Sequence, residues 1–147
     1  MPAYILIFLL WVSAVCGYPV VINGIDTVDQ GLAELREAFP DWEENYIEHE
    51  FDCSEMSAFV YEYLKCCGLE PELKTGVNEE GTYAHAWVEC QGKIIEATWL
   101  HVNLDKSFYN SLEEYEMSAS KAKNEIDWWN SQYIKGLQDD ELMSWGQ

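Results

Sequence analysis

The sequence is poor in basic side chains. Its 147 residues include 8 Lys and Arg against 27 Asp and Glu, which gives a formal net charge of −19 at pH 7. A field of this sign repels phosphate backbones and anionic membrane surfaces, so nucleic acid is disfavoured as a partner. The simplest interpretation of the acidity is a solvated, soluble surface, which ranks above the recruitment of a cationic substrate.

The sequence also lacks the spacings that are typical of metal sites. It has no C-x-x-C pair and no D-x-D-x-D-G loop, and the adjacent Cys66 and Cys67 lack the usual spacing of zinc ligands. We therefore expect neither a metal nor a cofactor.

If a leader is removed after Cys16, four cysteines remain: Cys53, Cys66, Cys67 and Cys90. An oxidising compartment would permit disulfides among them, and their pairing stays open.

Charge is missing from the N-terminal stretch, where the first charged side chain is Asp26. Residues 3–15 have the length and apolarity of a signal-peptide core, although no Lys or Arg precedes them. Pro19 ends this stretch before the roughly 20 apolar residues of a full membrane span. We predict residues 1–17 to be a signal peptide or an N-terminal membrane anchor. The protein is then secreted or at the cell surface, and it contacts a membrane only through this segment if the segment stays uncleaved.

Residues 18–147 contain no internal repeat and no Pro/Gly/Ser-rich linker, and we predict that they form a single domain. Thr27 is a suitable cap for a helix over residues 28–39, with Pro40 beyond its end. A second capping pattern, Ser111 with Glu114, opens a long apolar stripe that predicts a helix reaching to about residue 137.

The strongest helix signal covers residues 53–67. Asp52 and Glu55 form a capping-box pattern before it, and Gly68 is the residue preferred just past a helix end. Apolar residues within it recur at helical spacing, and Cys53 lies three residues before Met56 on the same face. We therefore expect Cys53 in the first turn, pointing toward whatever the helix packs on.

Three strands are predicted after this helix, at residues 73–77, 83–90 and 93–98. Gln91-Gly92 forms the turn between the second and third strands, and a loop of two or four residues there places His85 opposite Thr98 and puts His85 and Glu96 on one face of the hairpin. They are then diagonal neighbours about 7–8 Å apart at the backbone, which their side chains bridge. A three-residue loop would put them on opposite faces, so the turn length tests this prediction.

A cysteine, a histidine and a carboxylate are the residue types that a thiol acyl-transfer enzyme needs. The thiolate attacks a carbonyl, the histidine manages its proton, and the carboxylate orients the histidine. The start of a helix favours a thiolate at Cys53, whereas Asp52 and Glu55 oppose it. Alone, Cys53 is best interpreted as a small buried hydrophobic residue. Its combination with His85 and Glu96 favours the functional interpretation.

The segments that carry these three residues resemble a known protein family. Cys53 followed by an apolar helix to Gly68-Leu69, then His85-Ala86-Trp87-Val88-Glu89, then Glu96-Ala97-Thr98, resembles the core of the transglutaminase-like superfamily, part of the wider papain-like fold. The similarity covers roughly residues 46–98. Glu96 stands where that family usually has aspartate, and Ala97 where it usually has proline.

The resemblance implies an α+β fold: a Cys-bearing helix packed on a small antiparallel sheet, flanked by N- and C-terminal helices. It also implies Cys53 as nucleophile, His85 as general base and then acid, and Glu96 as the orienting group. The backbone N–H of Cys53 is one candidate oxyanion donor. The second is sought upstream, at the indole of Trp42, at Tyr46 or at Asn45.

Two functions follow as hypotheses. The first is an exported thiol enzyme that acts on amide bonds of peptides, proteins or cell-surface polymers, by hydrolysis or by transfer to an amine. The alternative is a non-catalytic extracellular binding or adaptor domain that retains the fold. Glu96, Ala97 and the small size of the chain motivate this alternative. A cation-binding role for the acidic surface is the weakest interpretation, because no calcium loop is present.

Overall fold

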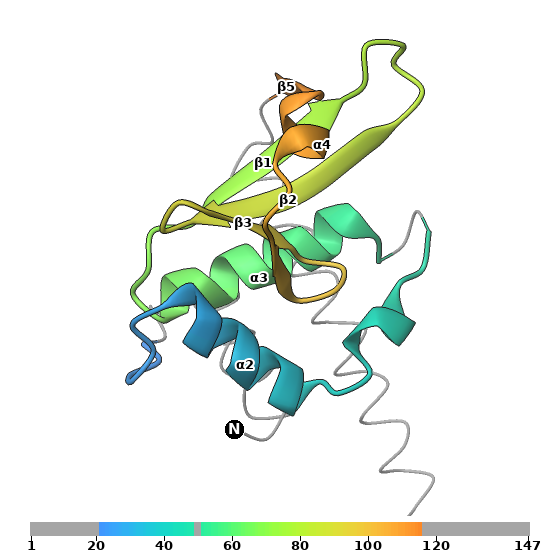
Figure 1. Cartoon of the computed structure of the whole chain (residues 1–147). Helices are drawn as coiled ribbons and strands as arrows, with labels where there is room; N and C mark the ends of the chain where they lie inside the picture. Colours follow the sequence, from blue (N-terminus) through green and yellow to red (C-terminus); the bar gives the residue numbers. More distant parts are fainter. Residues whose placement is uncertain (1–20, 49–50, 116–147) are drawn as a thin grey trace, which may run out of the picture.

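A five-stranded antiparallel sheet carries helices on both faces in the computed structural model, which describes residues 21–48 and 51–115 (Figure 1). The strand order is β4-β3-β2-β1-β5. In chain order the elements are α2 (Val28–Ala38), the 3-10 helix η1 (Trp42–Asn45), α3 (Cys53–Cys66), β1 (Glu72–Val77), β2 (Ala84–Cys90), β3 (Lys93–Glu96), β4 (His101–Asn103), α4 (Ser107–Asn110) and β5 (Glu113–Tyr115). This is the predicted α+β class.

Local capping sets the ends of the two longer helices, as predicted. In α2 the Thr27 side chain accepts from the Gln30 N–H, and the Gln30 side chain accepts in return from the backbone of Thr27. In α3 the same reciprocal box joins Asp52 and Glu55. The α3 helix ends at Cys66, and Gly68 follows its C-cap Cys67 with a φ of 81°, a conformation that glycine adopts without strain.

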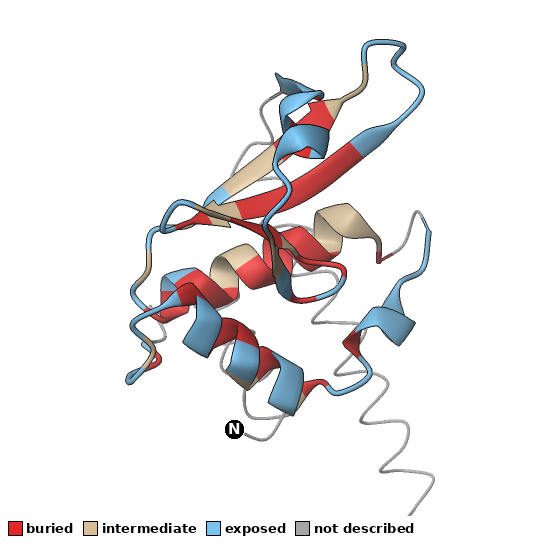
Figure 2. Ribbon diagram, in the orientation of Figure 1, coloured by how far each residue is buried: buried red, intermediate tan, exposed pale blue. Residues whose placement is uncertain are grey.

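Helix α3 lies between α2 and the sheet, and its buried residues join the two layers (Figures 1 and 2). The lack of a side chain at Gly31 lets α2 approach closely, since a Cβ there would lie 3.1 Å from a methyl group of Leu64. Near the end of α2, Trp42 packs edge-on or tilted against three phenylalanine rings, those of Phe39, Phe51 and Phe59. This aromatic cluster attaches η1 to the core.

The β2–β3 hairpin has the predicted register. Val88 pairs with Ile95 and Cys90 with Lys93, so the loop is the two-residue turn at Gln91-Gly92. Both turn residues have positive φ, 51° for Gln91 and 71° for Gly92, as a tight hairpin turn of this length requires. Gln91 is a strained choice there, and its side chain is engaged elsewhere: it accepts from the Val28 N–H and donates to the Asp26 carbonyl. The turn is thereby tied to the start of α2.

The two faces of the sheet have different neighbours. Val88 and Ile95 belong to the main core shared with α3, whereas Trp87 and Ile94 pack with two residues from the α4 region, Tyr109 and Leu112. Gly76 permits this second cluster, because a Cβ there would lie 2.7 Å from the Cβ of Leu112. Side chains alternate between the two faces along each strand. His85 on β2 therefore points away from the face of Val88, Glu96 on β3 points away from the face of Ile95, and both lie on the α4 side of the sheet.

Two strands were not predicted. β4 extends the sheet beyond β3, and β5 pairs with β1 through Thr75 to Val77. The helix predicted to open at Ser111 is wrong in its first turn, since Glu113–Tyr115 is a strand. An edge strand offers unpaired backbone groups, and pairing with them outweighs a local capping pattern. The third strand ends at Glu96 and not at Thr98, because a turn follows it.

Two of the sequence predictions concern residues outside the described ranges. The signal peptide or anchor at residues 1–17 and the helix beyond residue 115 lie outside the described residues. Within residues 21–48 and 51–115, no helix combines the length and apolarity needed to cross a membrane.

Candidate active site

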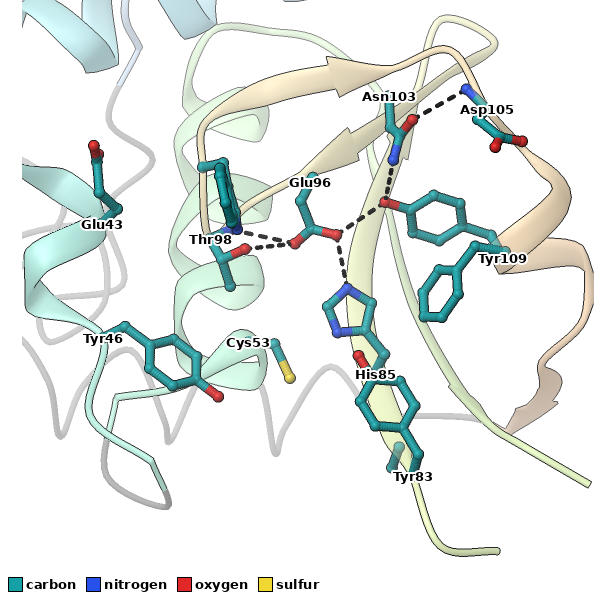
Figure 3. A pocket seen from close by; sticks show the side chains of 13 residues that line it. Glu43, Tyr46, Cys53, Tyr83, His85, Glu96, Thr98, Asn103, Asp105 and Tyr109 are labelled. Atoms are coloured by element: carbon teal, nitrogen blue, oxygen red, sulfur yellow. Dashed lines mark hydrogen bonds and ion pairs between the residues drawn. The ribbon is translucent and has the colours of Figure 1, made fainter. Parts of the chain in front are cut away.

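A pocket of about 580 Å³ opens where the start of α3 meets β2 and β3 (Figure 3). Cys53 reaches it from the first turn of α3, His85 from β2 and Glu96 from the end of β3. The structure therefore brings the three predicted site residues into one cavity. Its lining comprises Glu43, Tyr46, Cys53, Tyr83, Ala84, His85, Glu96, Thr98, Trp99, Asn103, Asp105, Phe108 and Tyr109.

His85 and Glu96 are in direct contact. The imidazole Nε2 lies 2.8 Å from Glu96 Oε2, and the two side chains are only 10% and 12% exposed. This bond follows from the hairpin register, which makes the two residues diagonal neighbours on one face. Because Nε2 faces Glu96, the edge of the ring that carries Nδ1 is directed toward the Cys53 side of the pocket (Figure 3).

The environment of His85 favours its charged form. Burial lowers the pKa of His85, but hydrogen bonding to Cys53 and Glu96 and the negative charges of both groups outweigh it and raise that pKa to about 9. The imidazole is therefore protonated at neutral pH. A cationic ring beside a thiol is the arrangement in which a thiolate–imidazolium pair forms.

Glu96 is held as a carboxylate. Burial raises its pKa, but hydrogen bonds from His85, Thr98 and Tyr109, together with the positive His85, lower that pKa below the ordinary value. Oε1 accepts from the Thr98 hydroxyl at 2.8 Å, and Oε2 accepts from the Tyr109 hydroxyl at 2.9 Å as well as from His85. Both oxygens of the side chain are thus occupied.

Aromatic rings surround the imidazole. The Trp87 ring, also on β2, and the Tyr83 ring, just before β2, lie at centroid distances of 6.3 and 6.1 Å from the imidazole, with interplanar angles of 15° and 19°. Phe108 meets the imidazole edge-on from α4, and Tyr109 is tilted against it. The rings therefore restrict the orientation of His85.

A family model described as the transglutaminase-like superfamily matches residues 26–106, more than half of the chain. The chain belongs to the transglutaminase-like superfamily. The matched range contains Cys53, His85 and Glu96, and it ends before Tyr109. Domains of this superfamily are in general cysteine-dependent acyltransferases or peptidases. Comparisons with curated proteins and with solved structures gave no significant match.

Of the three upstream residues predicted as oxyanion donors in this superfamily domain, the structure places one, Tyr46, in the pocket. Trp42 is 1% exposed, and its indole N–H donates to the Ala97 carbonyl at 2.7 Å, so it is not brought to the pocket. The Asn45 amide N–H₂ donates to the carbonyls of Asp41 and Trp42. Tyr46 does line the pocket, and partial burial and the nearby Cys53 raise its pKa, so its hydroxyl keeps its proton.

Sequence reasoning did not single out Tyr109 and Asn103. Tyr109 follows β4 in a short helix that carries no distinctive pattern, and only packing onto Trp87 brings it to Glu96. Thr98 stands in the Glu-Ala-Thr stretch that carried the resemblance, although its hydrogen bond to Glu96 was not predicted. Trp42 contributes to the site indirectly, because its hydrogen bond to the Ala97 carbonyl holds the backbone between Glu96 and Thr98.

The charged side chains that line the pocket are mainly acidic. Glu43 and Asp105 stand on its rim, and neither Lys nor Arg occurs among the described residues that line it. Across residues 21–48 and 51–115, no group of three or more His, Cys, Asp and Glu side chains is placed to hold a metal ion. The thiols of Cys53, Cys66, Cys67 and Cys90 are free.

Proposed function

We propose that this superfamily domain is a thiol-dependent acyl-transfer enzyme. It acts on amide bonds of peptides, proteins or cell-surface polymers. Cys53 is the nucleophile, His85 the proton carrier and Glu96 the orienting carboxylate. The observation that supports this most is the 2.8 Å contact between His85 and Glu96 inside a pocket that Cys53 also lines.

In the first half of the reaction the Cys53 thiolate attacks the amide carbonyl carbon and forms a C–S bond. The carbonyl electron pair moves onto oxygen. As the tetrahedral intermediate collapses, the C–N bond breaks and protonated His85 gives its Nδ1 proton to the departing amine. The product is a thioester on Cys53. In the second half, water or an amine attacks this thioester, His85 accepts the proton of the attacking group, and the thiolate leaves.

The oxyanion of the intermediate needs donors near Cys53. The backbone N–H of Cys53 lies in the first turn of α3, where N–H groups have no acceptor within the helix. The Tyr46 hydroxyl is a side-chain donor that lines the pocket beside Cys53 (Figure 3). We assign these two groups to the oxyanion, and the bond from Trp42 to Ala97 argues against the indole in that role.

We place the reaction outside the cell or at its surface. This part of the proposal rests only on the apolar character of residues 1–17. N-terminal sequencing of the protein recovered from the medium and from membranes tests it. A mature N-terminus near residue 18 supports a cleaved leader, and an intact N-terminus in the cytoplasmic fraction contradicts export.

The central test is the rate of alkylation of Cys53 by iodoacetamide across pH, followed by mass spectrometry. Wild type is compared with His85→Ala, and Cys53→Ala reports the background from all other thiols of the chain. We expect Cys53 to be alkylated faster in wild type than in His85→Ala at neutral pH, because a cationic imidazole beside the sulfur favours the thiolate. Labelling of Cys53 at neutral pH that does not depend on His85 would overturn the triad.

The alternative is a binding domain without activity. Glu96 and Ala97, which depart from the usual Asp-Pro of the family, favour it. An activated ester separates the two functions, because an enzyme of the proposed kind forms a thioester on Cys53 and then releases it. A folded protein whose Cys53 alkylates rapidly but never acylates would support the binding domain.

A further inference from the structure

We infer that Tyr109, itself held by Asn103, is a positioning residue that fixes the Glu96 carboxylate for His85. The inference rests on the proposed function, since it assigns how the third member of the triad is kept in place. Tyr109 lies beyond the residues matched by the family model, which end at residue 106.

The first step is the set of donors around Glu96. Thr98 donates to Oε1, while His85 and Tyr109 both donate to Oε2 at 2.8 and 2.9 Å. His85 lies on β2, which pairs with the strand that carries Glu96, and Thr98 lies in the turn directly after Glu96. Tyr109 comes from α4 and is the donor that connects the carboxylate to a separate element.

The second step is the direction of each bond. The Asp105 backbone N–H can only donate, so the Asn103 atom 3.0 Å from it is Oδ1. Asn103 Nδ2 therefore faces Tyr109 and donates to its hydroxyl oxygen at 3.1 Å. With a donor on that oxygen, the single Tyr109 proton is directed to Glu96. Burial and the Glu96 charge also raise the pKa of Tyr109, so the proton stays on the hydroxyl.

The third step is the length of the side chain. Glutamate has one more rotatable bond than the aspartate usual in this family, and each free torsion adds conformations in which the carboxylate misses the imidazole. A donor from outside the hairpin selects among these conformations. Tyr109 is suited to this role because it is only 4% exposed and packs on Trp87 at a centroid distance of 5.2 Å.

The test is an NMR titration of the His85 ring in the full chain, with Tyr109→Phe as the main variant. The variant keeps the aromatic packing and removes only the hydroxyl. If Tyr109 positions Glu96, we expect the pKa of His85 to fall by about half a unit to one unit from its wild-type value near 9. If Tyr109 only shares the charge of Oε2, its loss makes Glu96 a better acceptor for His85, and the pKa stays or rises. Either of these last results overturns the inference.

Two further variants make the result specific. Tyr63→Phe removes the hydroxyl of another buried tyrosine, on α3 beside Cys67, and should leave the His85 titration unchanged. In a Glu96→Gln background, Tyr109→Phe should have no further effect, because the coupling passes through the Glu96 charge. An equal shift in both backgrounds would contradict the inference.

Asn103→Ala provides a second approach at a half-buried position, in case Tyr109→Phe does not fold. It should lower the pKa of His85 in the same direction, by less. The titration does not depend on the reactivity of Cys53. If alkylation proves independent of His85, the proposed function fails, while the titration still decides whether Tyr109 positions Glu96.

Discussion

Glu96 is where most hydrogen bonds of the site converge. Its position at the end of β3 makes it a diagonal neighbour of His85, and its extra methylene is compatible with a 2.8 Å contact. A longer carboxylate therefore occupies the place of the family's aspartate without losing the imidazole. Thr98 and Tyr109 both donate hydrogen bonds to this longer carboxylate.

Replacing Glu96 with glutamine should lower the pKa of His85 and change how stability depends on pH. The folded-state pKa of about 9 is above the ordinary 6.5, so protonated His85 stabilises the fold fully below pH 6.5, and this contribution is lost as pH rises to about 9. We expect the stability advantage of wild type over Glu96→Gln to shrink across this window. Urea unfolding at several pH values measures it.

Glu80→Gln is the matched control for that comparison, because Glu80 is exposed in the loop between β1 and β2. Its difference from wild type should be small and independent of pH between 6.5 and 9. An advantage of wild type over Glu96→Gln that grows with pH would show that Glu96 does not stabilise a charged His85.

Tyr46→Phe separates acyl chemistry from thiol reactivity. Alkylation forms no oxyanion, so its rate at Cys53 should be unchanged. Acylation by an activated ester does form one, and we expect it to slow by about 100-fold, the usual cost of losing an oxyanion donor. Tyr61→Phe, which removes the hydroxyl of a tyrosine on α3 that does not line the pocket, should affect neither rate. Equal acylation by wild type and Tyr46→Phe would remove Tyr46 from the oxyanion site.

At the scale of elements, the site depends on where helix α3 begins and on the turn between β2 and β3. The capping box at Asp52 sets where α3 begins and therefore where Cys53 lies, and the turn at Gln91-Gly92 sets the face on which His85 and Glu96 meet. Both features were predictable because each depends on residues only a few positions apart. The pairings of β4 and β5 were not, because they depend on which strand edges remain open after folding.

Asp52→Ala should destabilise the domain by about 1 kcal/mol, the typical cost of losing an N-cap. Asp52→Asn should cost much less, since its amide oxygen accepts the same bond from the Ser54 N–H that Asp52 accepts at 2.9 Å. Chemical denaturation measures both. Equal losses in the two variants would mean that the charge of Asp52, and not its capping bond, supports α3.

Gly76→Ala tests the contact between the sheet and the α4 region. Its Cβ would lie 2.7 Å from Leu112 Cβ and 3.1 Å from the Trp87 ring, so these side chains must move. We expect a loss of about 1–3 kcal/mol, as for other overpacked sites. A weaker Tyr109–Glu96 contact should also appear as a lower pKa of His85.

Gly31→Ala is the companion variant to Gly76→Ala. There the new Cβ meets the far end of the flexible Leu64 side chain at 3.1 Å, and alanine favours the helix by up to about 1 kcal/mol. It should therefore be close to neutral. If Gly76→Ala were equally neutral, the close approach of Leu112 would not constrain the α4 region.

For the whole molecule, charge is the dominant property. A formal net charge of −19 surrounds a pocket with acidic residues on its rim, so the field at Cys53 attracts cations and repels anions. Substrates with a positive group near the reacting amide are consequently the ones we expect to arrive fastest.

Charged thiol reagents measure this field directly. A cationic methanethiosulfonate should label Cys53 about tenfold or more faster than an anionic one at low ionic strength. The ratio should approach one at about 1 M salt, where charges are screened within about 3 Å. Cys53→Ala gives the background for each reagent. A ratio that does not change with salt would show that the acidic surface has no influence on the site.

The sequence by itself determined the capped Cys53 helix, the hairpin parity that unites His85 with Glu96, and the acidity of the molecule. Each of these follows from residues a few positions apart or from composition. Only the tertiary structure decided which side chains complete the site. Trp42 and Ala97 are 55 positions apart, and their hydrogen bond occupies the indole N–H that would otherwise be a candidate oxyanion donor. Tyr109 reaches Glu96 because α4 packs on Trp87. Such contacts depend on how separate elements bury their apolar faces together, which local patterns do not specify.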